Sequence, residues 1–73
     1  MAFYIRVRNV QLFNAIYAEA PPHLVQTKHT AGTYTLYTDN ALLWHELFLY
    51  GQILAQDQDA YIDGGEEEPL NLQ

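Results

Sequence analysis

The stretch from Asp39 to Gln56 constrains the fold of this chain more than any other stretch. It opens with Asp39 and Asn40, either of which can cap a helix by accepting hydrogen bonds from the free N–H groups of the first turn. At about 100° per residue, the apolar residues that follow fall into two sectors of a helix. The larger sector holds Tyr50, Leu43, Leu54, Leu47, Gly51, Trp44, Ala55 and Phe48, and the smaller one holds Leu49, Leu42 and Ile53. The pattern predicts a main helix over about residues 40–56 with enough apolar surface for two contacts.

At the beginning of the chain, apolar residues recur with the period of a strand instead of a helix. From Phe3 to Arg8, apolar and polar residues alternate, which predicts a half-buried strand. The apolar side of this strand carries Phe3, Ile5 and Val7, and the polar side carries Tyr4, Arg6 and Arg8.

The next segment, about residues 10–19, fits two interpretations. Its apolar residues recur at helical spacing behind Asn9, a residue that can cap a helix, but Val10, Leu12 and Ile16 also suit one side of a strand. We favour a short helix, because the segment is rich in alanine, which has the highest helix propensity. Pro21 and Pro22 then end the helix, since proline lacks an N–H donor and restricts the residue before it.

Two further strands are predicted from His23 to His29 and from Gly32 to Thr38, because both segments are rich in Thr, Tyr, Val and Leu. Gly32 suits the turn between them, since glycine readily adopts positive φ. The resulting order is strand, helix, strand, strand, helix. It predicts an α+β fold in which a small three-stranded sheet, antiparallel or mixed, packs against the main helix.

The charge of this 73-residue chain is unevenly distributed. The formal net charge is −6, yet six of the nine acidic residues follow Gln56, where there is no Lys or Arg. Gly64 and Gly65 predict a break, and the acidic, weakly apolar end of the chain is typical of disorder. We therefore expect one folded domain over residues 1–62 and an acidic flexible tail over residues 63–73.

Candidate catalytic and metal-binding patterns are incomplete. His45 and Glu46 resemble the start of a zinc-binding helix, but Leu49 stands where that motif needs a second histidine. Asp57 and Asp59 follow the spacing of a calcium loop, but the remaining ligand positions do not match it. The chain has no Cys and no Ser, and its close carboxylate pairs lie in the predicted tail. We expect no enzymatic activity, no metal and no cofactor.

The polar side of the first strand is the predicted protein-binding site. Tyr4, Arg6 and Arg8 form one row there, and Tyr and Arg are enriched at the energetic centres of interfaces. Nucleic acid is not an expected direct partner, because phosphate binding needs clustered Lys and Arg and this chain has only three such residues. The smaller apolar sector of the main helix is the competing surface.

In size, composition and acidic end, the chain resembles the small phage-encoded proteins that regulate host machinery, including those that bind bacterial RNA polymerase. This is a resemblance of overall character, carried by no motif. It implies a small inhibitor or modulator of transcription that acts in the host cytoplasm, as a monomer or weak homo-oligomer. No signal peptide or membrane span is expected.

Two other functions fit the same sequence. An acidic nucleic-acid mimic could inhibit a defence nuclease, as anti-CRISPR and anti-restriction proteins do, although the carboxylates here are not evenly spread. A structural or assembly subunit could use the main helix to complete a homo-oligomer.

Overall fold

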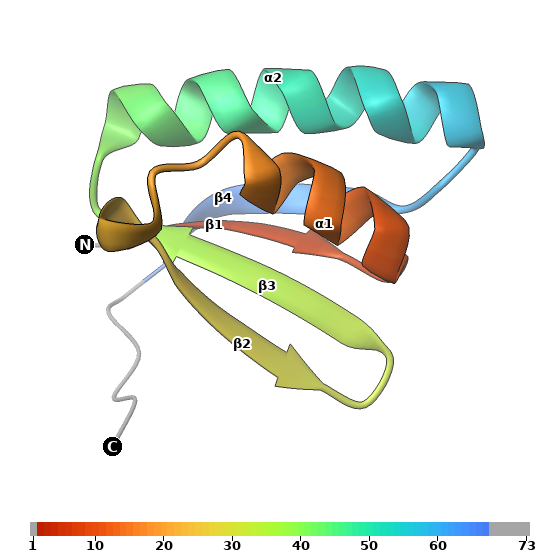
Figure 1. Cartoon of the computed structure of the whole chain (residues 1–73), viewed down its shortest axis with the longest axis horizontal. Coiled ribbons are helices and arrows are strands. Elements are labelled where there is room, and N and C mark those ends of the chain that lie inside the picture. The colour runs from red at the N-terminus through yellow and green to blue at the C-terminus, as the bar shows by residue number, and fades with distance from the viewer. Residues whose placement is uncertain (1, 68–73) are drawn as a thin grey trace.

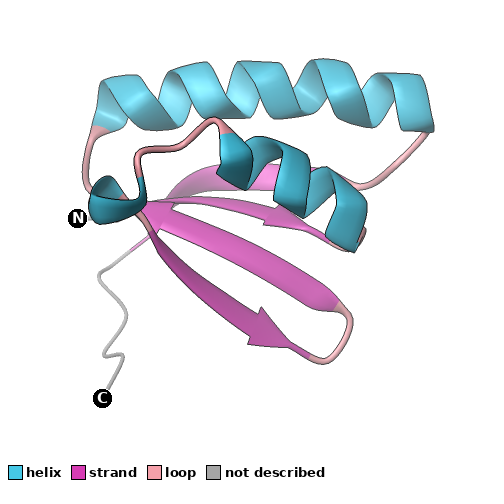
Figure 2. Ribbon diagram, viewed as in Figure 1, coloured by secondary structure: helices cyan, strands magenta, loops and turns pink. Residues whose placement is uncertain are grey.

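A computed structural model describes residues 2–67 as two layers, a four-stranded sheet and two helices that cover one of its faces (Figure 1). The elements in chain order are β1 (Ala2–Val7), α1 (Val10–Ala18), a 3₁₀ turn η1 (Pro22–Leu24), β2 (Gln26–Thr30), β3 (Thr33–Thr38), α2 (Ala41–Gln58) and β4 (Ile62–Glu67). The strand order is β2-β3-β1-β4, and every neighbouring pair is antiparallel. The helices lie on one side of the sheet, and within residues 2–67 no helix or strand covers the other side (Figure 2).

The first strand holds the centre of the sheet. Ile5 lies opposite Leu36 on β3 and opposite Gly64 on β4, so these three residues share the face beneath the helices. Ile5 and Val7 are almost fully buried, which confirms the predicted alternation along β1. The buried apolar core comprises Ile5, Val7, Leu12, Phe13, Ile16, Ala20, Leu36, Leu47 and Ala55. Each fully buried large side chain contributes about 1.5–3 kcal/mol to folding.

The short helix α1 is confirmed, and the strand interpretation of the same segment is wrong. Asn9 caps the helix through its side-chain oxygen, which accepts hydrogen bonds from the backbone N–H groups of Gln11 and Leu12. Leu12, Phe13 and Ile16 are buried against the rest of the core.

The main helix α2 is confirmed and extends slightly beyond its predicted end. Asn40, rather than Asp39, is its N-cap and accepts a hydrogen bond from the N–H of Leu43. At the other end, Asp59 adopts a left-handed conformation with φ 51° and ends the helix. The indole N–H of Trp44 donates to the carbonyl oxygen of Tyr4 at 2.8 Å, which fixes α2 to the central strand.

The sheet has four strands rather than the predicted three, because residues 62–67 pair with the free edge of β1. The prediction of a flexible acidic tail over residues 63–73 is therefore wrong for residues 63–67. Residues 68–73 lie outside the described residues. Gly64 permits a close approach between β4 and α2: a Cβ at that position would lie 2.7 Å from Cε1 of Phe48. Any side chain there would force the ring of Phe48 to shift.

The predicted strand from His23 also begins later than expected. Pro22, His23 and Leu24 form the 3₁₀ turn, and β2 starts at Gln26. Proline at the start of the turn fixes a φ that suits helical geometry. The connection between β2 and β3 is as predicted, because Gly32 has φ +82° in the two-residue loop.

Candidate protein-binding surfaces

The outer face of α2, defined as Leu42, Leu49 and Ile53, exposes three large apolar side chains to solvent. Leu42 is 79% exposed, Ile53 is 61% exposed and Leu49 is 47% exposed. These residues form the smaller apolar sector of the sequence, and they face away from the sheet. Both α1 and the sheet pack against other sides of the helix, where Leu47, Gly51 and Ala55 are buried.

A shallow groove of about 630 Å³ runs beside the carboxyl-terminal half of this outer face. Its lining is partly apolar and comes from α2, from the loop after it and from the start of β4: Leu49, Gln52, Ile53, Ala55, Gln56, Asp59, Ala60 and Ile62. Leu49 and Ile53 therefore belong both to the outer face and to the lining of this groove, which also includes Ile62. This extension was not predicted, because β4 was not predicted.

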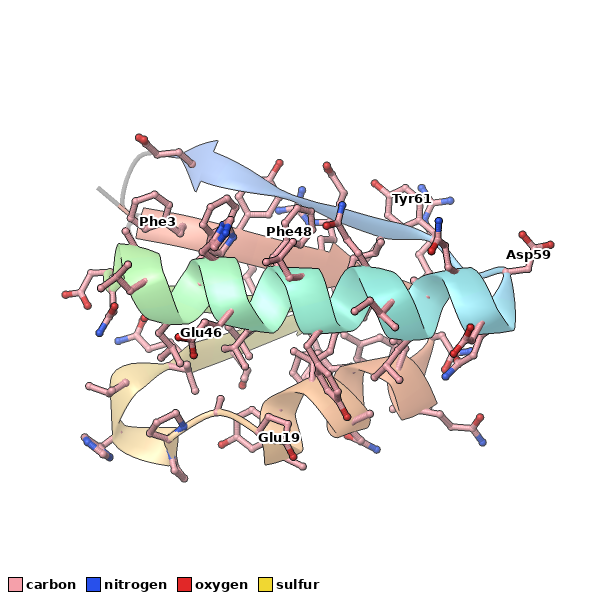
Figure 3. The ribbon with its side chains drawn as sticks, turned by 90° about the horizontal axis from the view of Figure 1, so that it is seen from above. Phe3, Glu19, Glu46, Phe48, Asp59 and Tyr61 are labelled. Atoms are coloured by element: carbon pink, nitrogen blue, oxygen red, sulfur yellow. The ribbon has the colours of Figure 1, made fainter. Side chains whose placement is uncertain are left out.

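Apart from histidine, the charged residues of the two helices and their caps are acidic. Within the helix layer, Glu46 and Asp57 belong to α2, and Glu19 and Asp59 are the C-caps of the two helices. Neither α1 nor α2 contains Lys or Arg. From above the helix layer, Figure 3 shows Glu46 beside α2 and Asp59 at its carboxyl end. Glu46 and Asp57 therefore lie on the same helix as the outer face, and Asp59 lies at the end of that helix.

All three basic residues of the chain lie on the sheet side. Arg6 is opposite Thr35 on β3, and Thr35 is opposite Lys28 on β2, so the three side chains form one row across the open face. His29, the neighbour of Lys28, instead contacts Phe13 of α1, as strand alternation requires. Arg8 follows the end of β1 and stacks against Tyr61.

The predicted site residues Tyr4, Arg6 and Arg8 make contacts within the molecule. The hydroxyl of Tyr4 donates to Oδ2 of Asp63 at 3.3 Å, and Nε of Arg6 donates to Oγ1 of Thr35 at 3.2 Å. Cζ of Arg6 lies 4.7 Å from the centre of the Tyr4 ring, and Cζ of Arg8 lies 4.3 Å from the centre of the Tyr61 ring. Tyr4 and Arg6 thus form one ordered group, and Arg8 belongs to a separate pair.

The three histidines are dispersed. His23 lies in η1, His29 packs in an edge-to-face arrangement with Phe13 and Tyr34, and His45 lies beside Trp44 on α2. Within residues 2–67, no three His, Asp or Glu side chains are grouped so that they could hold a metal ion.

Comparison with known proteins adds no relatives: no protein-family model and no curated protein matches the chain. Neither helix of the described part of the chain has the length and apolar character that a membrane crossing requires.

Proposed function

We propose that this protein is a small regulator that acts by stoichiometric binding to a protein partner, without catalysis. The observation that carries this proposal is the outer face of α2, where three large apolar side chains are exposed on one side of one helix. Scattered exposed apolar residues are ordinary, but several large apolar residues exposed on one side of a helix beside polar residues are typical of an interaction site. Glu46 and Asp57 lie on the same helix.

The first partner to test is bacterial RNA polymerase. The resemblance to small phage-encoded regulators supports this choice, and it implies inhibition or modulation of transcription in the host cytoplasm. In this proposal the outer face of α2 supplies the apolar centre of the interface. A second contact through Tyr4, Arg6 and Arg8 remains a prediction from the sequence.

A promoter-directed transcription assay tests this function. Purified protein is titrated against a fixed amount of bacterial RNA polymerase, and we expect inhibition to saturate near one protein per polymerase. The Leu49→Gln/Ile53→Gln double variant should weaken inhibition, and Arg6→Ala and Arg8→Ala test the second contact. Absence of binding to polymerase at micromolar concentration would exclude this partner. Affinity capture of a nuclease complex would instead favour the nucleic-acid mimic.

A further inference from the structure

The spacing along the outer face of α2 fits a helical ligand. Leu49 follows Leu42 by two helical turns, and Ile53 follows Leu49 by one more, so the strip is about 16 Å long at about 1.5 Å per residue. Beyond Ile53 the groove continues to Ala60 and Ile62. A helix laid beside α2 would present its own apolar residues at one-turn intervals along this line, as helices bound in apolar grooves do.

The charged residues near the outer face indicate which charge a ligand should carry. Glu46 and Asp57 belong to α2 near the strip, and Asp59 lines the groove. A ligand with Lys or Arg beside its apolar residues would meet opposite charge along both the helix and the groove. A second copy of α2 would offer no such charge, because the helix has no Lys or Arg, and it would add carboxylates to a border that is already acidic.

From this geometry and charge we infer that the outer face of α2 and its groove bind a basic amphipathic helix of the partner protein. This inference rests on the proposed function and names the chemistry of the partner segment. It does not depend on the partner being RNA polymerase, since the recognition requires only apolar residues on one face and Lys or Arg beside them.

A synthetic peptide tests the inference directly. The probe is an amphipathic Leu/Lys helix of about 18 residues, or about five turns. A control peptide has the same composition in an order that disperses the leucines around the helix, and a second control replaces every Lys with Glu. We expect the full chain to bind the first peptide at least about tenfold more tightly than either control, because only that peptide matches both strip and border.

Matched variants of the full chain locate the binding site. Leu49→Gln/Ile53→Gln should weaken binding of the Leu/Lys helix at least about tenfold, since each buried apolar side chain lost from the interface costs about that factor or more. Val10→Gln is the control, because Val10 is 46% exposed on α1 and lies outside the strip. It should leave affinity unchanged. Amide NMR shifts of the labelled protein should change along α2 and at residues 60–62.

Several results would overturn the inference. Failure to bind at about 100 µM would do so, because a match of both apolar residues and charge should give at least the roughly 5.5 kcal/mol of binding free energy that this concentration represents. The inference would also be overturned if the control peptide with dispersed leucines bound as tightly as the Leu/Lys helix, or if Val10→Gln weakened binding as much as Leu49→Gln/Ile53→Gln. NMR shift changes confined to the open face of the sheet would overturn it as well. A dimer in sedimentation that Leu49→Gln/Ile53→Gln dissociates, and that the peptide does not displace, would assign the strip to a second copy. The transcription assay reports separately on the proposed function.

Discussion

The inner and outer faces of α2 carry similar apolar side chains, but the inner face is buried in the core and the outer face is exposed to solvent. On the inner face, Leu47 is buried against the sheet and α1, whereas on the outer face Leu42 remains exposed. Apolar content alone therefore does not distinguish a residue that stabilises the fold from one that is available to a partner. What distinguishes them is the rest of the molecule: one sheet and one short helix cover only part of the circumference of α2 (Figure 1).

The largest expected effect is on the inner face. Leu47→Ala should lower the free energy of unfolding by about 2–5 kcal/mol, because it leaves a cavity in the core where the side chain was 4% exposed. Chemical denaturation followed by circular dichroism measures this change. In a domain this small, such a loss is a large share of the total stability. An unchanged unfolding midpoint would mean that α2 is rotated differently.

A smaller effect is expected where the inner face meets β4. Gly64→Ala should cost about 1–3 kcal/mol, because the new Cβ would lie 2.7 Å from the ring of Phe48. Gly65→Ala on the same strand is the matched control, since its Cβ would lie 3.5 Å from the nearest atom of Tyr4, an ordinary contact distance. Equal stability of the two variants would show that Phe48 does not pack on β4.

The smallest effect on stability is expected on the outer face. Leu42→Ala makes the same chemical change as Leu47→Ala but should alter the free energy of unfolding by no more than about 0.5 kcal/mol, since the side chain contacts little. The same denaturation experiment applies to both variants. If Leu42→Ala proves as destabilising as Leu47→Ala, the outer face belongs to the fold and the proposed binding surface is wrong.

The sequence predicted those features whose cause is local. Asn9 and Asn40 mark helix starts because their side chains cap free N–H groups within three residues. The two apolar sectors of α2 follow from helical periodicity. Strand alternation placed Tyr4 and Arg6 together on the open face, where they form one ordered group.

Features decided by distant contacts were not predicted. The strand β4 has no apolar alternation, and its place in the sheet depends on the free edge of β1 and on the fit of Gly64 beneath Phe48. Because β4 was missed, so were the groove at Ile62 and the contact of Asp63 with Tyr4. The helical wheel separated the two apolar sectors of α2, and the smaller one is the sector that the sheet leaves uncovered.

The central claim is that the outer face of α2 serves binding and not folding. The most direct test measures both properties in the Leu49→Gln/Ile53→Gln variant: the denaturation midpoint, and inhibition of RNA polymerase in the transcription titration. The account predicts an unchanged midpoint together with weakened inhibition, because both side chains are exposed in the free protein. A midpoint that falls in step with inhibition, or full inhibition by the folded variant, would contradict it.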